Sequence, residues 1–128
     1  MKTALTLIDI QNDYFPSGRK PLEGEFVVVK HSPNGFLEIS LLDKLRELEV
    51  ERLVAAGMMT HMCTDATVRA ASDLGFEVWL AQDACATREL VFEKITIPAS
   101  QVQAAFLAAL QDAYASVMPT SAVLERLS

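Results

Sequence analysis

The stretch from Gly57 to Val78, GMMTHMCTDATVRAASDLGFEV, decides how this chain folds. An apolar run from Leu53 to Ala56 leads into it and predicts a buried strand that ends near Gly57. Gly75 supplies the residue that a left-handed helix C-cap prefers. Between the two glycines, small or apolar residues recur with the spacing of one helix face, at Ala66, Thr67, Ala70, Ala71 and Leu74. A strand, a turn, a helix and a second strand form the repeating unit of an α/β fold.

Cys63 occupies the turn between that strand and that helix. At a helix start the backbone N–H groups point outward and the helix dipole is positive, which favours the thiolate over the thiol. We therefore expect a depressed pKa for Cys63 and a role as a nucleophile. A buried structural cysteine is the alternative, and this stretch by itself does not separate the two.

The rest of the sequence predicts strands and helices in alternation. Thr3–Ile10 is so continuously apolar that we expect it to be buried on both faces of a parallel sheet. The segment from Gln82 to Pro98 reads as a polar connection. The other expected strands are Glu25–Lys30, Glu51–Ala56, Phe76–Ala81 and Ser116–Met118, and the expected helices are Leu37–Leu48, Ala99–Ala115 and a short last turn from Pro119. This alternation predicts one domain, residues 1–128, with a three-layer α/β/α fold and a mostly parallel sheet.

Composition and charge exclude several functional classes. The net charge of −6 argues against nucleic acid or an anionic membrane as a partner. No apolar run approaches the roughly 20 residues that cross a membrane, and Met1–Ile10 has no cleavage-like site of a signal peptide. Two isolated histidines, His31 and His61, without clustered carboxylates make a weak case for a metal. We expect a cytoplasmic protein that acts on a small molecule, with no cofactor and no metal.

Three chemically active side chains follow predicted strands. Asp9, Lys30 and Cys63 each lie at or just past a strand's carboxyl end. Parallel strands bring these ends to one edge of the sheet, where open α/β folds bind their ligands. A carboxylate there needs a partner, and an ammonium would stabilise both carboxylate and thiolate. Singly, Asp9 could be a turn residue and Lys30 a solvated strand end, but together the three predict a site.

Several motifs resemble the isochorismatase-like cysteine hydrolase superfamily. LIDIQNDYF (7–15) is similar to its first aspartate motif, VVVKH (27–31) to its lysine strand, and the 57–78 stretch to its nucleophile motif. DACATRE (83–89) resembles the segment after the next strand. The resemblance covers most of the chain. It implies an isochorismatase-like, Rossmann-like fold and the hydrolysis of a C–N bond in a small amide through a thioester.

The resemblance also implies roles for individual residues. Cys63 would be the nucleophile, Asp9 the general base and Lys30 the cation between them. A cis peptide bond at Met58–Met59 would turn the N–H groups of Met59 and Cys63 toward a developing oxyanion. Residues of the first loop that could contact a substrate are Asn12, Tyr14 and Phe15.

The chain departs from the family between its first strand and the lysine segment. Typical members carry a helix, a strand and a long loop there, whereas this chain has only Gln11–Gly24, so one helix and one strand of the usual fold are missing. The metal-binding cluster of nicotinamidases belongs to that interval, which disfavours a nicotinamidase. An uncovered sheet face between Ile10 and Glu25 would favour a homo-oligomer, a dimer or tetramer.

The missing interval also leaves a second function open. A shortened, non-catalytic relative could serve as an assembly or ligand-binding subunit. An ordinary pKa of the Cys63 thiol would favour that interpretation, and a depressed pKa would favour catalysis.

Overall fold

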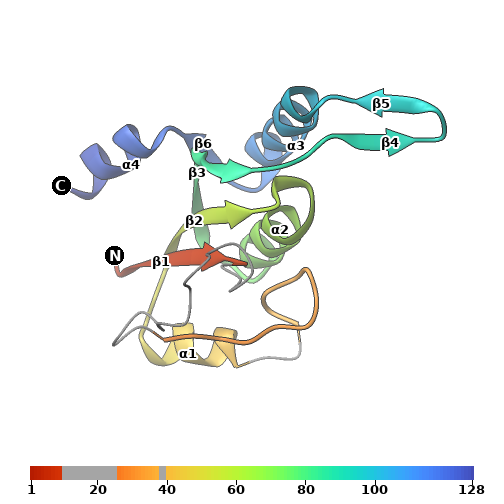
Figure 1. The fold of residues 1–128 in the computed structure, drawn as a ribbon. Coiled ribbons are helices and arrows are strands. Elements are labelled where there is room, and N and C mark those ends of the chain that lie inside the picture. Colours follow the sequence, from red (N-terminus) through yellow and green to blue (C-terminus); the bar gives the residue numbers. More distant parts are fainter. Residues whose placement is uncertain (10–25, 38–39) are drawn as a thin grey trace, which may run out of the picture.

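A computed structural model describes residues 1–9, 26–37 and 40–128 of the chain. Along the sequence, the secondary-structure elements are β1 (Thr3–Ile8), α1 (Leu41–Glu47), β2 (Arg52–Met58), the π-helix η2 (Thr60–Thr64), α2 (Asp65–Asp73), β3 (Glu77–Ala86), β4 (Leu90–Phe92), β5 (Ile95–Ile97), α3 (Ala99–Ala113), β6 (Ser116–Met118) and α4 (Thr120–Leu127) (Figure 1).

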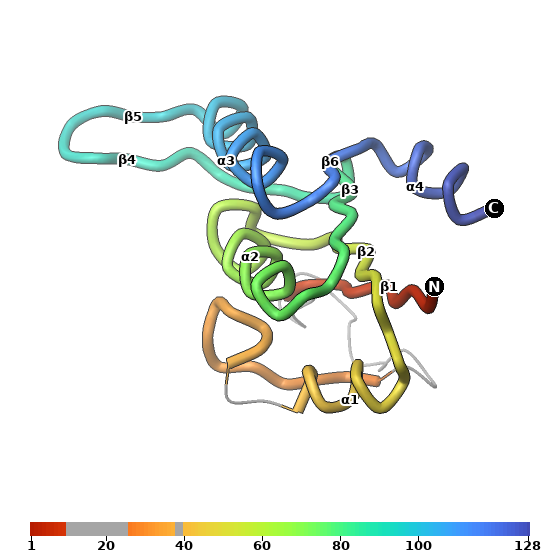
Figure 2. Tube along the Cα trace, turned by 180° about the vertical axis from the view of Figure 1, so that it is seen from behind, coloured from red at the N-terminus to blue at the C-terminus, as the bar shows by residue number. Residues whose placement is uncertain are grey.

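The central sheet has the strand order β1-β2-β3-β6, and every neighbouring pair is parallel. One face packs against α1, α2 and α3, with Leu45, Val68 and Leu110 among the buried side chains. The other face packs against α4, where Val123 meets Trp79. Figure 2 shows α2 and α3 on one side of the strands and α4 on the other. The predicted α/β fold with a mostly parallel sheet is therefore confirmed.

Two of the predicted elements are wrong. Residues 26–30 form no strand within the described chain, because β-forming side chains such as those of Val27 and Val29 do not by themselves provide a hydrogen-bonded neighbour. The segment from Gln82 to Pro98, predicted to be a polar connection, contains regular strand structure. β3 runs on through Ala86, and β4 and β5 then pair as an antiparallel hairpin.

Helix α1 begins later than the predicted Leu37–Leu48. Residues 31–37 form bends and turns, and the N–H of Phe36 donates to Asn34 Oδ1 at 2.9 Å. Asparagine side chains compete in this way with helical hydrogen bonding. The first regular turn therefore starts at Leu41, where Lys44 N–H donates to the carbonyl of Ser40 at 3.0 Å.

Strand β1 is not buried on both faces, contrary to the prediction. Ile8 is buried, but Leu5 is 65% exposed and Leu7 is 46% exposed. Leu5 is in register with Val54, which packs against the α4 side of the sheet. Because α4 packs over β2, β3 and β6, the same face of β1 is left with exposed leucines.

Gly57 allows β1 and β2 to approach closely just before Asp9. Its φ is 139°, and a Cβ built on it would lie 2.1 Å from the carbonyl oxygen of Ile8. Such a distance is far below van der Waals contact, and the atom it would meet is backbone that cannot move aside. A side chain at this position would therefore displace the residue that precedes Asp9.

We expect Gly57→Ala to lower the free energy of unfolding by about 3 kcal/mol or more, since it adds a backbone clash to an unfavourable φ. Urea denaturation measures this. The matched control is Gly75→Ala, because Gly75 also has a positive φ of 94° but a Cβ there would meet nothing within 4 Å. That control is expected to cost about 1 kcal/mol. Equal losses in the two variants would contradict the clash at Ile8.

Candidate active site

Asp9, Lys30 and Cys63 meet in a closed triangle of contacts. The Cys63 thiol donates to Asp9 Oδ2 at 3.2 Å, and Lys30 Nζ donates to Cys63 Sγ at 3.3 Å. Lys30 Nζ also lies 3.3 Å from Asp9 Oδ1. The three residues come from distant parts of the sequence, and the structure brings them together as the sequence predicted. Cys63 is only 8% exposed, so the triangle is largely shielded from water.

Asp9 is positioned by the end of β1. The strand stops at Ile8, which is in register with Gly57. Asp9 then adopts a φ of 59°, in the left-handed region that aspartate enters more readily than most residues. The Asp9 carboxylate lies at the carboxyl edge of the sheet. There it contacts Cys63, which follows the end of the neighbouring strand β2.

Lys30 reaches the site from a loop, whereas the sequence predicted a strand. Its Nζ donates to the carbonyl of Ser32 at 3.1 Å, which holds the ammonium close to its own loop. Thr67 of α2 holds that loop in turn, since its Oγ1 accepts from Gly35 N–H at 2.9 Å and donates to the Pro33 carbonyl at 3.3 Å. Sequence reasoning assigned Thr67 only to a packed helix face. The sequence feature that could have indicated this role is a hydroxyl side chain on a helix face of buried alanine and valine residues.

Cys63 lies on the π-helix η2 and not at the start of a regular α-helix. The Met58–Met59 peptide bond that precedes η2 is cis. The carbonyl of Met59 accepts from Met62 N–H at 2.9 Å and Thr64 N–H at 3.3 Å. Thr60 Oγ1 donates to the carbonyl of Ala86 at 3.2 Å and so fastens η2 to the end of β3. Single π-turns are frequent at functional sites. An oxyanion hole formed by the N–H groups of Met59 and Cys63 stays a prediction.

The predicted depression of the Cys63 pKa is wrong. Burial raises the pKa of the thiol above its ordinary value, and the hydrogen bond to Asp9 raises it further. Lys30 acts in the opposite direction, through its hydrogen bond and its charge, but does not outweigh the other two. The position of Cys63 near a helix start does not reveal this, because desolvation depends on what packs around the sulfur. The resting group is therefore a thiol hydrogen-bonded to a carboxylate.

Thiol alkylation tests these opposing influences. In a Cys85→Ala background, which removes the other cysteine, we expect the iodoacetamide rate of Cys63 to rise with a midpoint above the ordinary cysteine pKa of about 8.5. Lys30→Met removes a group that lowers this pKa, so its midpoint should move up. Asp9→Asn removes a charge that raises it, so its midpoint should move down. Shifts in the same direction for both variants would contradict the geometry.

His61 and Thr87 form a contact beside Cys63 that the sequence did not predict. His61 Nδ1 lies 2.6 Å from Thr87 Oγ1, and the imidazole meets the ring of Phe106 edge-on at a centroid distance of 6.1 Å. Burial, and then the charge of Arg88, lower the pKa of His61, so the ring is neutral at pH 7. Together with the Thr60–Ala86 hydrogen bond, this contact joins η2 to the segment that follows β3.

The sequence also predicted substrate contacts from residues of the first loop. Asn12, Tyr14 and Phe15 lie outside the residues that the structure describes. Across residues 1–9, 26–37 and 40–128, no three His, Cys, Asp or Glu side chains cluster in a way that could hold a metal ion.

Among the helices in these ranges, none is both long and apolar enough to span a bilayer.

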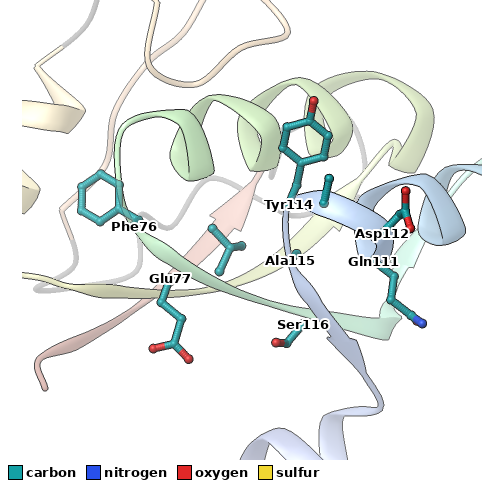
Figure 3. Close-up of a pocket in the computed structure, with 9 residues that line it drawn as sticks. Phe76, Glu77, Gln111, Asp112, Tyr114, Ala115 and Ser116 are labelled. Atoms are coloured by element: carbon teal, nitrogen blue, oxygen red, sulfur yellow. The ribbon is translucent and has the colours of Figure 1, made fainter.

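A pocket of about 350 Å³ lies away from this triangle. Figure 3 shows lining residues from two segments: Phe76 and Glu77 lie just before and at the start of β3, and Tyr114 and Ser116 lie between the end of α3 and the start of β6. The triangle lies at the carboxyl edge of the parallel sheet, whereas this pocket lies at the amino end of β3. We assign it no part in the chemistry of Cys63.

Comparison with known proteins identifies the family. The model of the isochorismatase domain matches residues 18–122. The isochorismatase family protein YddQ of Bacillus subtilis, itself uncharacterised, is 37% identical over 98% of this chain and 100% of its own length. The crystal structure of an isochorismatase from Pseudomonas putida has a TM-score of 0.77 at 41% identity, over 80% of this chain. A cysteine hydrolase from Pseudomonas syringae has a TM-score of 0.80 at 24% identity over 84% of this chain, which shows a shared fold.

The same comparisons show that this chain is short. It spans 53% of the Pseudomonas putida structure and 51% of the Pseudomonas syringae structure. The match to YddQ runs over 180 aligned positions, more than the 128 residues present here, so that relative carries residues with no counterpart in this sequence. The shared motifs, fold and matched length nevertheless agree: this chain belongs to the isochorismatase family.

Proposed function

We propose that this protein is a cysteine hydrolase that cleaves a C–N bond of a small amide through a thioester on Cys63. The observation that carries the proposal is the closed triangle in which Cys63 Sγ contacts Asp9 Oδ2 at 3.2 Å and Lys30 Nζ at 3.3 Å. A thiol, a carboxylate and an ammonium in mutual contact supply a nucleophile, a base and a fixed positive charge. Family membership supports hydrolysis as the reaction class.

The proposed reaction begins with proton transfer from Cys63 Sγ to Asp9 as sulfur attacks the amide carbon. The carbonyl oxygen becomes an oxyanion that the N–H groups of Met59 and Cys63 would receive. Asp9 returns the proton to the amide nitrogen, the C–N bond breaks and an amine leaves. Asp9 then takes a proton from water as the water oxygen attacks the thioester carbon. The C–S bond breaks, the carboxylic acid leaves, and Asp9 returns the proton to sulfur to restore the thiol. Lys30 offsets the negative charge that Asp9 and sulfur share.

A panel of small amides tests this proposal. We expect amine release, together with an intact-protein mass increased by the acyl group and located at Cys63 by peptide mapping. Isochorismate belongs in the panel as a contrast, since its cleavage needs no thiol nucleophile. Amine release without an acyl adduct, and at the same rate in Cys63→Ala, would exclude the proposed mechanism.

A second candidate function is a non-catalytic binding or assembly subunit. Two observations favour it: the pKa of the Cys63 thiol is raised, and the chain spans about half of several related structures. Burial of the thiol raises this pKa first, and its hydrogen bond to the carboxylate base raises it further. Both are compatible with the catalytic proposal, which we therefore prefer. Calorimetry separates the two, because a subunit of this kind would bind small amides without ever releasing the amine.

We also propose that the protein acts as a homo-oligomer on a small-molecule substrate in the cytoplasm. Exposed Leu5 and Leu7 on β1 support a contact at that side of the sheet, while the adjoining residues 10–25 lie outside the described chain. Sedimentation equilibrium at low micromolar concentration is expected to give at least twice the 14.0 kDa mass of one chain. A stable 14.0 kDa species under these conditions would contradict self-association.

A further inference from the structure

Thr67 on α2 contacts the loop that follows Lys30, residues 31–37, as both donor and acceptor. Its Oγ1 accepts from Gly35 N–H at 2.9 Å and donates to the Pro33 carbonyl at 3.3 Å. The side chain is only 3% exposed, so water competes little for these hydrogen bonds. Figures 1 and 2, drawn from opposite sides, both show the loop, in orange, beside α2. One hydroxyl therefore ties two backbone groups of the loop to the helix.

The loop fits closely against this hydroxyl. A Cβ built on Gly35 would lie 3.2 Å from both Cγ2 and Oγ1 of Thr67, which is tighter than ordinary van der Waals contact. Glycine therefore lets the loop backbone come within hydrogen-bonding distance of Thr67. Farther along the loop, the ring of Phe36 stacks on that of Phe76 with centroids 6.0 Å apart. Of these two attachments, the hydroxyl is the one nearer to Lys30 along the sequence.

The attached loop in turn holds the ammonium of Lys30. Lys30 Nζ donates to the carbonyl of Ser32 at 3.1 Å, and Pro33 follows Ser32 directly. The same ammonium lies 3.3 Å from Asp9 Oδ1 and 3.3 Å from Cys63 Sγ. A movement of Pro33 away from α2 would therefore carry the Ser32 carbonyl, and with it the ammonium, away from the triangle.

Thr67 and Cys63 belong to one continuous helical segment. η2 ends at Thr64 and α2 begins at Asp65, with no residue between them. Thr67 follows Cys63 by four residues, a spacing that places two side chains on the same side of a helix. The helix that presents the sulfur therefore also holds the loop that presents the cation, so a single element sets the distance between the two.

We propose that Thr67 is a positioning residue that holds Lys30 against Cys63 through residues 32–35 of the loop. Without the hydroxyl, the loop would keep its Phe36 stacking, but the ammonium would lie less closely against sulfur. Lys30 lowers the pKa of the Cys63 thiol, so a looser contact would raise this pKa. The inference rests on the geometry of the triangle, and only its consequence for catalysis rests on the proposed hydrolysis.

Alkylation of the thiol as a function of pH, in the Cys85→Ala background, tests the inference. Thr67→Val keeps the shape of the side chain and removes the hydroxyl. We expect its midpoint to move up, as in Lys30→Met, with the thiolate fraction at neutral pH lowered about threefold. Thr67→Ser keeps the hydroxyl and should restore the midpoint of the parent chain. An unchanged or lower midpoint in Thr67→Val would overturn the proposal.

Thr64→Val is the matched control. Thr64 lies on the same helical segment and is 0% exposed, but its Oγ1 has no hydrogen-bond partner among the described residues. The same exchange of hydroxyl for methyl there leaves the loop attached, so the midpoint should equal that of the parent chain. A shift as large as that of Thr67→Val would mean that the loss of any buried hydroxyl near the thiol has this effect, and the proposal would fall.

A double substitution separates positioning from a general loss of structure. Because Thr67 is proposed to act through Lys30, Thr67→Val should not raise the midpoint further in a Lys30→Met chain. Equal shifts with and without the Lys30 ammonium would contradict this coupling and overturn the proposal. If far-UV circular dichroism shows that Thr67→Val does not fold, Gly35→Val displaces the same contact from the loop side. It should give the same upward shift, and an unchanged midpoint would then be decisive against the proposal.

Amide turnover gives a separate readout. In a chain that releases amine, Thr67→Val is expected to lower kcat with a smaller change in KM, since it acts on the reacting groups, and Thr67→Ser should recover the loss. A parent chain that releases no amine would contradict the proposed hydrolysis, while the alkylation midpoints would still decide the role of Thr67. Unshifted midpoints in a chain that does release amine would overturn the role of Thr67 alone.

Discussion

Replacing Cys63 by alanine is expected to lower kcat/KM for amide hydrolysis by at least about 1,000-fold. In the proposed mechanism the thiol supplies the atom that forms the thioester, and its neighbours cannot replace it. The Lys30 ammonium has no free electron pair while it is charged. The Asp9 carboxylate would form a mixed anhydride, which is a poorer route from an amide. Initial rates on the best amide of the panel, with the acyl adduct followed by mass spectrometry, measure the effect.

Two further variants sharpen this result. Cys63→Ser keeps the size of the side chain but replaces the thiol with a weaker nucleophile, so it should also lose most of its activity. Cys85→Ala is the control, because Cys85 Sγ donates to the Ala81 carbonyl at 3.3 Å and is not one of the three residues of the triangle. Comparable activity in Cys63→Ala and Cys85→Ala would remove Cys63 from the mechanism.

Asp9→Asn is expected to reduce kcat by about 100- to 10,000-fold, with a much smaller change in KM. The amide keeps the shape of the carboxylate but cannot accept the proton that leaves Cys63. Because the same substitution should lower the pKa of the thiol, more thiolate would be present while turnover falls. That combination distinguishes a lost base from a lost nucleophile, and pH profiles of kcat and of alkylation measure it.

The control for this variant is Asp65→Asn. Asp65 lies close to Cys63 in sequence but is ion-paired with Arg69, with its Oδ1 2.9 Å from the Arg69 Nη2. It should retain most of its activity. If Asp9→Asn turned over substrate as fast as the parent chain, the proton would have to leave by another group, and the assignment of Asp9 would be wrong.

The spacing of apolar side chains along the sequence correctly predicted several helices and strands. The apolar run before Gly57 and the helical spacing after Cys63 correspond to β2 and α2. β6 at Ser116–Met118 and the helix that starts near Ala99 are also confirmed. The hairpin was missed because its strands are short, at three residues each. Three residues are too few to show an alternation, and the polar segment before them concealed the extension of β3.

Lys30 shows how a residue can be predicted correctly from an incorrect element. The motif around it resembled that of a family, and the ammonium does contact Asp9 and Cys63. Its backbone is a loop, held by Thr67 through Gly35 and Pro33, and no strand is formed. A side-chain pattern can favour a strand, but the neighbouring backbone that completes a sheet comes from elsewhere in the chain.

The sequence by itself determined the strand–turn–helix unit around Cys63 and the three residues that meet there, because side-chain spacing and motif positions are local properties. Only the tertiary structure decided the protonation of Cys63, since the burial that raises its pKa comes from segments far apart in the sequence. The same holds for the exposed leucines of β1 and the exposed hairpin. Whether an apolar side chain is buried depends on what packs over it, and the described part of this chain leaves Leu5, Leu7 and Phe92 exposed.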